Sequence, residues 1–163
     1  MARAGGTMVD LLVLVRHGKA EPKGPEGDLA RELTPDGVAA LEEAYPRIFA
    51  TLEPVGELEL WSSPAARAER TAEVAADALG VDPMDIVVHD SLYEQDEDGF
   101  VSELSCVDGG TVVAVGHVPF MRNMVELLCG EDVPFGKGTV AAIDFPTGRL
   151  AAGQARLLWL REA

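Results

Sequence analysis

The stretch LVLVRHGKA, residues 12–20, joins four apolar residues directly to an arginine, a histidine and a glycine. The apolar run from Met8 to Val15, interrupted only by Asp10, is typical of a strand buried on both faces of a sheet. In a parallel α/β sheet, binding sites form where the strands end, because the following loops gather at one edge. We therefore expect Arg16 and His17 to leave a buried strand at a functional edge, with Gly18 letting the backbone turn and approach a ligand closely.

The rest of the chain alternates strand-like and helix-like segments. Further strands are expected at residues 58–61, 86–88 and 111–115, and an antiparallel pair at residues 139–145 and 155–160. Helices are expected after Thr34-Pro35 and Ser63-Pro64, where a capping side chain precedes a proline suited to the first turn, and at residues 119–128. This order predicts an α/β fold, a three-layer sandwich whose mostly parallel central sheet has an antiparallel edge.

Length and composition predict one globular domain over residues 1–163, with residues 1–7 as a flexible N-terminal tail. No apolar run approaches the roughly 18 residues of a membrane span, so we expect no membrane partner. Cys106 and Cys129 show no metal-binding or redox spacing, which favours reduced thiols in a cytoplasmic protein.

Charge narrows the choice of ligand. The formal net charge is -15, with 13 Lys and Arg against 28 Asp and Glu. Nucleic acid is excluded as a partner because its phosphate backbone requires a basic surface. Arginines that converge on one point would instead form an isolated positive pocket on a negative molecule.

Such a convergence is predicted by the strand ends. Arg16 and His17 follow the first strand, Arg67 follows the second, and His117 follows the strand at residues 111–115. Two guanidinium groups match the oxygens of a phosphoryl group, and a histidine among them can act as nucleophile towards phosphorus. A histidine can attack phosphorus only if one ring nitrogen is unprotonated while the other donates to a fixed acceptor. The sequence therefore predicts a phosphate site in which a histidine is a bystander, a second hydrogen-bond donor or a nucleophile.

Five blocks of sequence carry a family resemblance. They are VRHG at 15–18, LTPDG at 33–37, SSPAARAERTA at 62–72, LYE at 92–94 and GHVP at 116–119. In this order they resemble the histidine phosphatase superfamily, which implies a phosphoglycerate-mutase-like fold. The segments KAEP at 19–22 and PFGKGTVAAIDF at 134–145, with Asp28 and Arg31 before LTPDG, resemble its small SixA-type phosphohistidine phosphatases.

The resemblance implies a role for each site residue. His17 would be the nucleophile, Arg16 and Arg67 the phosphoryl clamps, and His117 a donor to the phosphoryl oxygens. Glu94 occupies the position at which larger members carry a general acid. The surrounding YEQDED is equally consistent with a solvated acidic loop, so both readings of Glu94 stay open.

The expected activity is hydrolysis of phosphohistidine on a partner protein through a phosphohistidine enzyme intermediate. Expelling an alkoxide needs a positioned acid, worth roughly 10²- to 10⁴-fold, whereas an imidazole leaves readily. Residues 90–110 also leave little room for a lid, so the site should admit a protein. The alternatives are a phosphomonoesterase for a small phosphate ester and a non-catalytic phosphate sensor. No cofactor or metal is expected, because the three histidines have no carboxylate at ligand spacing.

Overall fold

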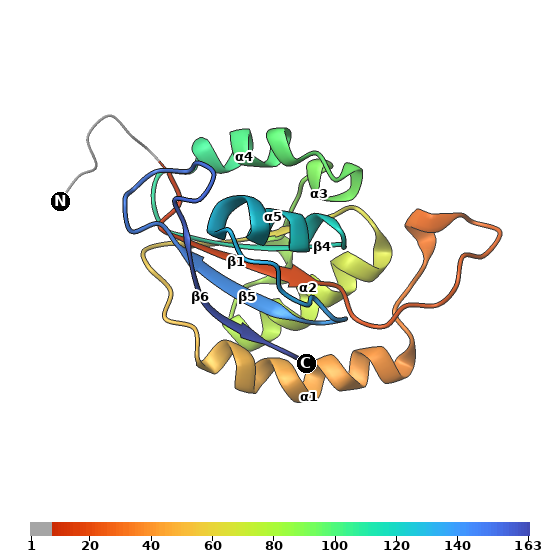
Figure 1. Ribbon diagram of the computed structural model, residues 1–163. Helices are drawn as coiled ribbons and strands as arrows, with labels where there is room; N and C mark the ends of the chain where they lie inside the picture. Colours follow the sequence, from red (N-terminus) through yellow and green to blue (C-terminus); the bar gives the residue numbers. More distant parts are fainter. Residues whose placement is uncertain (1–7) are drawn as a thin grey trace.

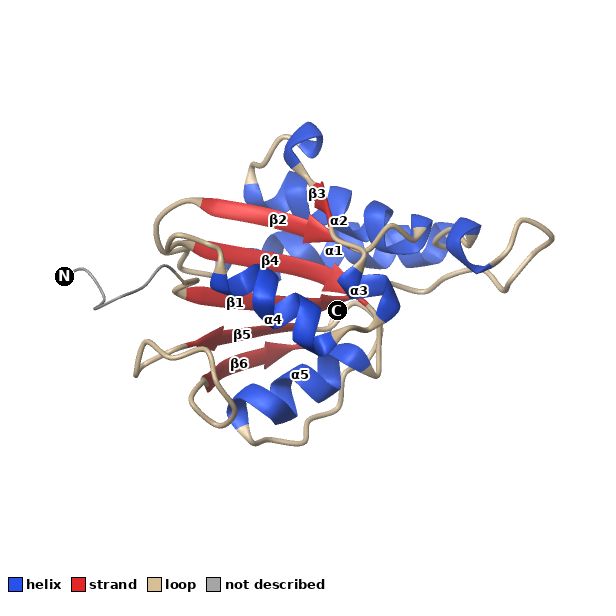
Figure 2. Ribbon diagram, turned by 90° about the horizontal axis from the view of Figure 1, so that it is seen from above, coloured by secondary structure: helices blue, strands red, loops and turns tan. Residues whose placement is uncertain are grey.

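Six strands form one sheet in the order β3-β2-β4-β1-β5-β6 (Figure 2). In the computed structural model, which describes residues 8–163, they are β1 Leu11–Arg16, β2 Leu58–Ser62, β3 Val87–Val88, β4 Thr111–Gly116, β5 Val140–Asp144 and β6 Arg156–Arg161. The first four of that order run parallel, and β5 is antiparallel to both β1 and β6. The predicted parallel sheet with an antiparallel edge is confirmed. The tail expected at residues 1–7 lies outside the described residues.

Helices cover both faces of the sheet (Figure 1). On one face lie α1 (Pro35–Ala50) and α2 (Ala66–Leu79), and on the other lie α3 (Ser91–Glu94), α4 (Glu97–Ser105) and α5 (Phe120–Cys129). Two short 3₁₀ helices, η1 (Asp28–Ala30) and η2 (Pro83–Asp85), lie in connecting loops. The fold is the three-layer sandwich that the sequence predicts.

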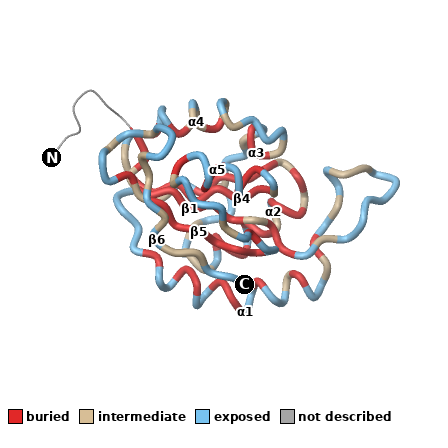
Figure 3. The backbone as a smooth tube through the Cα atoms, in the orientation of Figure 1, coloured by how far each residue is buried: buried red, intermediate tan, exposed pale blue. Residues whose placement is uncertain are grey.

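The burial of strand β1 explains why its first five residues are all apolar. Its residues point alternately to the two faces, as the period of two requires. Leu11, Val13 and Val15 pack into the core beneath α1 and α2, whereas Leu12 and Leu14 pack into the core beneath α4 and α5. All five are buried, so the strand is buried on both faces (Figure 3). The strand nevertheless begins at Leu11 rather than Met8, because Asp10 leaves the ladder to bind the backbone N–H of Gly110.

The two predicted helix starts have different outcomes. Thr34 caps α1 as expected, since its Oγ1 accepts a hydrogen bond from the N–H of Gly37 at 2.9 Å. The prediction that Ser63-Pro64 starts α2 is wrong. That helix begins at Ala66 after Ala65, which has no capping side chain, and the Ser63 hydroxyl contacts a histidine instead.

Residues 91–105 contain two helices that the sequence analysis leaves unassigned. In α4, only Phe100 and Leu104 are buried, and the remaining positions are mostly acidic or small. Two buried residues at i and i+4 give too short a pattern to separate a helix from an acidic loop. The cap at Asp96, which accepts from the N–H of Gly99 at 3.0 Å, is the sequence feature that marks its start.

Candidate active site

The ends of three parallel strands are held together by backbone hydrogen bonds. Strand register places Arg16 opposite Gly116, and the N–H of His17 donates to the carbonyl of Gly116 at 3.0 Å. On the other side of β4, the N–H of Ser63 donates to the carbonyl of Val115 at 2.9 Å. The segments that carry His17, His117 and Arg67 therefore start from one edge of the sheet.

A cavity of about 420 Å³ lies at this edge. Arg16, His17, Arg67 and His117 all line it, as the strand-end argument predicts, together with Asp28, Arg31, Tyr93, Gln95 and Lys137. The two histidine rings lie with their centroids 5.1 Å apart at an interplanar angle of 62°. The structure thus brings together all four residues expected to surround a phosphoryl group.

The ring of His17 is held in the orientation that a nucleophile needs. Its Nδ1 lies 2.7 Å from the carbonyl oxygen of Gly18, which can only accept, so Nδ1 carries the proton and Nε2 is the unprotonated nitrogen. Burial, reinforced by the charges of Arg67 and Arg16, lowers the pKa of His17 from its usual 6.5 to about 4. The imidazole is therefore neutral at physiological pH.

His117 is fixed from both ring nitrogens. Its Nε2 lies 2.8 Å from the hydroxyl oxygen of Ser63, and its Nδ1 lies 3.4 Å from a terminal nitrogen of Arg67. Burial, followed by the influence of His17 and Arg67, lowers the pKa of His117 to about 3. Because the guanidinium of Arg67 can only donate, Nδ1 accepts in this arrangement and Nε2 donates to the Ser63 hydroxyl. A hydroxyl both donates and accepts, so Ser63 also supports the tautomer that donates from Nδ1 when Nδ1 faces a phosphoryl oxygen.

The two arginines are each braced at their terminal nitrogens. One terminal nitrogen of Arg16 donates to the carbonyl of Phe135 at 2.9 Å. The two terminal nitrogens of Arg67 donate to the backbone carbonyl and the carboxylate of Asp28, at 2.8 Å and 3.1 Å. The Nε atoms of both arginines are buried and have no hydrogen-bond partner among residues 8–163. Two buried cationic donors without partners are suited to an anionic ligand.

Two other predicted site residues, Gly18 and Glu94, do not line the cavity. Gly18 donates its backbone N–H to the hydroxyl of Thr71 at 3.1 Å, so this group is not free for a ligand. A Cβ at this position would lie 2.9 Å from a methyl carbon of Leu41, so packing on α1 accounts for the glycine. Glu94 is exposed and does not line the cavity, although its neighbours Tyr93 and Gln95 do.

Several residues that line the cavity have no role in the substrate site that the sequence predicts, among them Asp28, Tyr93 and Lys137. Asp28 accepts hydrogen bonds from Arg67 and from the Tyr93 hydroxyl, and Lys137 brings a further cation to the rim. Asp28 and Lys137 lie inside segments already recognised by resemblance. Their position beside the motifs was the one sequence signal that they lie near the site. Contacts between distant residues, such as that between residues 28 and 93, leave no periodic pattern in the sequence.

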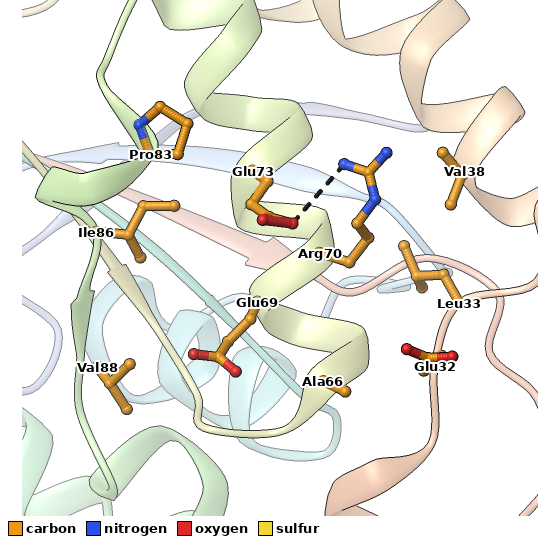
Figure 4. Close-up of a pocket in the computed structure, with 10 residues that line it drawn as sticks. All are labelled: Glu32, Leu33, Val38, Ala66, Glu69, Arg70, Glu73, Pro83, Ile86 and Val88. Carbon is orange, nitrogen blue, oxygen red and sulfur yellow. Dashed lines mark ion pairs between the residues drawn. The ribbon is translucent and has the colours of Figure 1, made fainter.

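A second cavity, of about 500 Å³, lies beside α2 and is unsuited to a phosphoryl group (Figure 4). Three carboxylates line it, from Glu32, Glu69 and Glu73. Its one cation, Arg70, lies 3.9 Å from the carboxylate of Glu73. Burial and the neighbouring Glu73 raise the pKa of Glu69, as expected where carboxylates crowd. A phosphoryl dianion would be repelled here.

Within the part of the chain that the structure describes, no cluster of three histidine, cysteine or acidic side chains could hold a metal ion. Across residues 8–163, none of the helices is both long and apolar enough to cross a membrane.

Comparison with family models assigns the chain to a family. Residues 12–102 match the model of the histidine phosphatase superfamily (branch 1), and the chain belongs to this superfamily. Membership implies a phosphatase, a hydrolase of phosphoryl groups. The matched range includes Arg16, His17 and Arg67, whereas His117 lies beyond it and joins the site through the fold. A search of curated proteins finds no match to the chain.

Solved structures agree with this assignment. A candidate phosphohistidine phosphatase SixA from Agrobacterium tumefaciens is 27% identical, with a TM-score of 0.75, and the alignment covers 94% of this chain and 98% of the other. A candidate SixA from Nakamurella multipartita is 28% identical, with a TM-score of 0.75 and coverages of 94% and 95%. The protein histidine phosphatase SixA complexed with tungstate is 22% identical, with a TM-score of 0.70 and coverages of 93% and 96%, and it shares the fold. The predicted resemblance to SixA-type members is confirmed.

Proposed function

We propose that the protein hydrolyses phosphohistidine on a partner protein, with His17 as the nucleophile. The observation that carries this proposal is that Arg16 and Arg67, whose buried Nε atoms have no hydrogen-bond partner among residues 8–163, line one cavity with two neutral histidines. Support also comes from the SixA-like structures, one of which holds tungstate, an oxyanion with the tetrahedral shape of phosphate.

The proposed first step is transfer of the phosphoryl group to His17. Its unprotonated Nε2 attacks phosphorus, so an N–P bond forms to His17 while the N–P bond to the substrate imidazole breaks. The substrate ring, which carries a proton on its other nitrogen, takes the electron pair of that bond and leaves as neutral imidazole. Arg16 and Arg67 stabilise the charge on the phosphoryl oxygens, and His117 donates to one of them.

The second step returns the enzyme to its starting state. Water attacks phosphorus, its oxygen replaces Nε2, and phosphate leaves with the water's remaining protons shared between phosphate and solvent. The electron pair of the N–P bond returns to Nε2, so His17 is again neutral. The donor at Nδ1, fixed on the carbonyl of Gly18, keeps the ring in the same tautomer through both steps.

The position of Glu94 favours phosphohistidine over a phosphate ester as the substrate. An alkoxide leaving group requires a proton from a positioned acid, and Glu94 is exposed outside the cavity. An imidazole leaving group has little need of one. Since α3 and α4 are short and no larger insertion precedes β4, a histidine on another folded protein has access to the cavity.

The experiment is phosphoryl trapping. The wild-type protein, mixed with a ³²P-phosphohistidine protein and quenched without acid, should carry the label, and His17→Ala should carry none. His89→Ala is the matched control, because His89 lies outside the cavity, and it should still be labelled. Phosphate release without a labelled wild-type intermediate would contradict the covalent mechanism. Phosphate binding without release would identify a sensor.

The substrate class is tested by comparing three phosphoryl donors under identical conditions. A phosphohistidine protein should give the highest kcat/KM, free phosphohistidine a lower one, and para-nitrophenyl phosphate the lowest. A preference for para-nitrophenyl phosphate would favour the phosphomonoesterase alternative.

A further inference from the structure

Asp28 lies at the junction between the cavity and a projecting loop. Residues 20–33 extend from the body of the protein beyond the end of β1 (Figure 1). Two isolated bridges, Ala20–Leu33 and Gly24–Gly27, hold the arms of the loop together. Asp28 lines the cavity from this loop, with its side chain 36% exposed.

The contacts of Asp28 converge on Arg67. Its backbone carbonyl accepts from one terminal nitrogen of Arg67 at 2.8 Å, and its carboxylate accepts from the other at 3.1 Å. Arg67 leaves the first turn of α2 and is almost fully buried, with a side chain only 7% exposed. An arginine side chain has many rotamers, so two contacts from one residue restrict it strongly.

Tyr93 also holds the carboxylate of Asp28. Its hydroxyl donates to the same oxygen that Arg67 contacts, at 2.8 Å, and its ring lies edge-on to His117 with the centroids 5.6 Å apart. Arg31 donates to the other carboxylate oxygen at 3.2 Å. These hydrogen bonds, with that of Tyr93 contributing most, hold the pKa of Asp28 well below its usual range. The carboxylate is therefore charged whenever the protein works.

A charged carboxylate beside the clamp has two opposing effects. It fixes the guanidinium of Arg67, a residue that lines the cavity, in one orientation. It also repels an incoming anion and offsets part of the positive charge that attracts it. Removing it should therefore impair the geometry of catalysis without weakening the binding of phosphate.

We propose that Asp28, held by Tyr93, is a positioning residue that fixes the Arg67 guanidinium for the transition state at the expense of affinity for the free anion. The inference rests on the proposed function, because it requires the transferred phosphoryl group to bind at Arg67. Asp28 acts through Arg67 and carries out no proton transfer, since its charge is permanent.

The kinetic test compares kcat with the dissociation constant of inorganic phosphate. Asp28→Ala should lower kcat on the phosphohistidine protein about tenfold, with phosphate bound as tightly as in the wild type or more tightly. Asp28→Asn, which keeps an acceptor oxygen, should recover part of the lost kcat. Tyr93→Phe removes one hydrogen bond and retains the ring and the charge, so it should lower kcat several-fold with phosphate affinity unchanged.

The matched control is Glu26→Ala, which removes a carboxylate from the same loop outside the cavity and should leave both quantities unchanged. An unchanged kcat in Asp28→Ala and Tyr93→Phe would overturn the proposal. So would an equal loss of kcat and phosphate affinity, because that is the result of a damaged fold.

The rotation of the Arg67 guanidinium can be measured without any enzymatic turnover. Nuclear magnetic resonance of ¹⁵N-labelled protein should show separate terminal-nitrogen signals for Arg67 in the wild type, because its guanidinium rotates slowly. In Asp28→Ala these signals should merge, and merged signals already in the wild type would overturn the proposal. If the wild type released phosphate from no substrate, the proposed function would fail while these spectra still decided the role of Asp28.

Discussion

At the scale of single residues, neutrality of the two imidazoles is the condition for the proposed chemistry. His17 and His117 are only 8% and 5% exposed, and both lie near Arg67. Burial and neighbouring positive charge act in the same direction, because each disfavours the imidazolium form. For the same reason, the two histidines bind protons more weakly in the folded protein than in the unfolded chain, which makes stability depend on pH.

The free energy of unfolding should fall as the pH falls from 6.5 towards 4. In the unfolded chain, histidine binds a proton near pH 6.5, whereas His17 and His117 bind one only at about 4 and 3. Protons therefore favour the unfolded chain in this interval, by up to about 2 kcal/mol per histidine at pH 5. Urea titrations at pH 7 and pH 5 measure the difference, which should be smaller in His17→Asn. An equal difference in both proteins would contradict the lowered pKa.

Glu94→Gln should leave kcat on phosphohistidine within about twofold of the wild-type value. The carboxylate is exposed outside the cavity, so no proton transfer to the leaving group depends on it. Steady-state assays at pH 7 test this, with Asp98→Gln, another exposed acidic position, as the control. A loss of 10²-fold or more would restore Glu94 as the general acid.

At the scale of helices and strands, the sequence predicts what local patterns determine. The apolar run of β1 and the cap at Thr34 each depend on a few adjacent residues, and both are found in the structure. Ser63 was misassigned because its hydroxyl has two possible uses, and only the fold reveals that His117 lies 2.8 Å away. The brace at Asp28 escaped prediction for the same reason, since its partners lie 39 and 65 residues away.

Gly37→Ala should lower the stability of the protein by about 1–3 kcal/mol through overpacking. A Cβ at this position would overlap the backbone carbonyl oxygen of Lys19 and lie 3.0 Å from the capping oxygen of Thr34. The Lys19 carbonyl also accepts from the N–H of Thr34 at 2.9 Å, so the start of α1 would be displaced from the loop after β1. Thermal unfolding measures the effect. Gly24→Ala, in an open loop, is the control and should unfold at the wild-type temperature.

At the scale of the whole molecule, an acidic protein presents an isolated cationic cavity. The formal net charge of -15 contrasts with the arginines and lysine that line the site. Such a charge distribution disfavours acidic partners and accelerates association with basic ones. Selection among phosphoproteins would then depend on the charge that surrounds the phosphorylated histidine.

Salt should therefore affect protein substrates more than small ones. Between 50 mM and 500 mM NaCl, kcat/KM for a phosphohistidine protein with basic flanking residues should fall several-fold as the long-range attraction is screened. Free phosphohistidine lacks those flanks and should show a smaller change. Equal salt dependence for the two substrates would mean that the surface charge of the enzyme plays no part in selecting its partner.

Two hydrogen bonds in series link α1 to His17, the proposed nucleophile. The hydroxyl of Tyr45, buried in α1, donates to the carbonyl of Gly138 at 3.0 Å, and the N–H of Gly138 donates to the carbonyl of His17 at 3.1 Å. The backbone of His17, the proposed nucleophile, is thus anchored through Gly138 to the helical layer. Substitutions at Tyr45 should therefore lower activity, although this residue does not line the cavity.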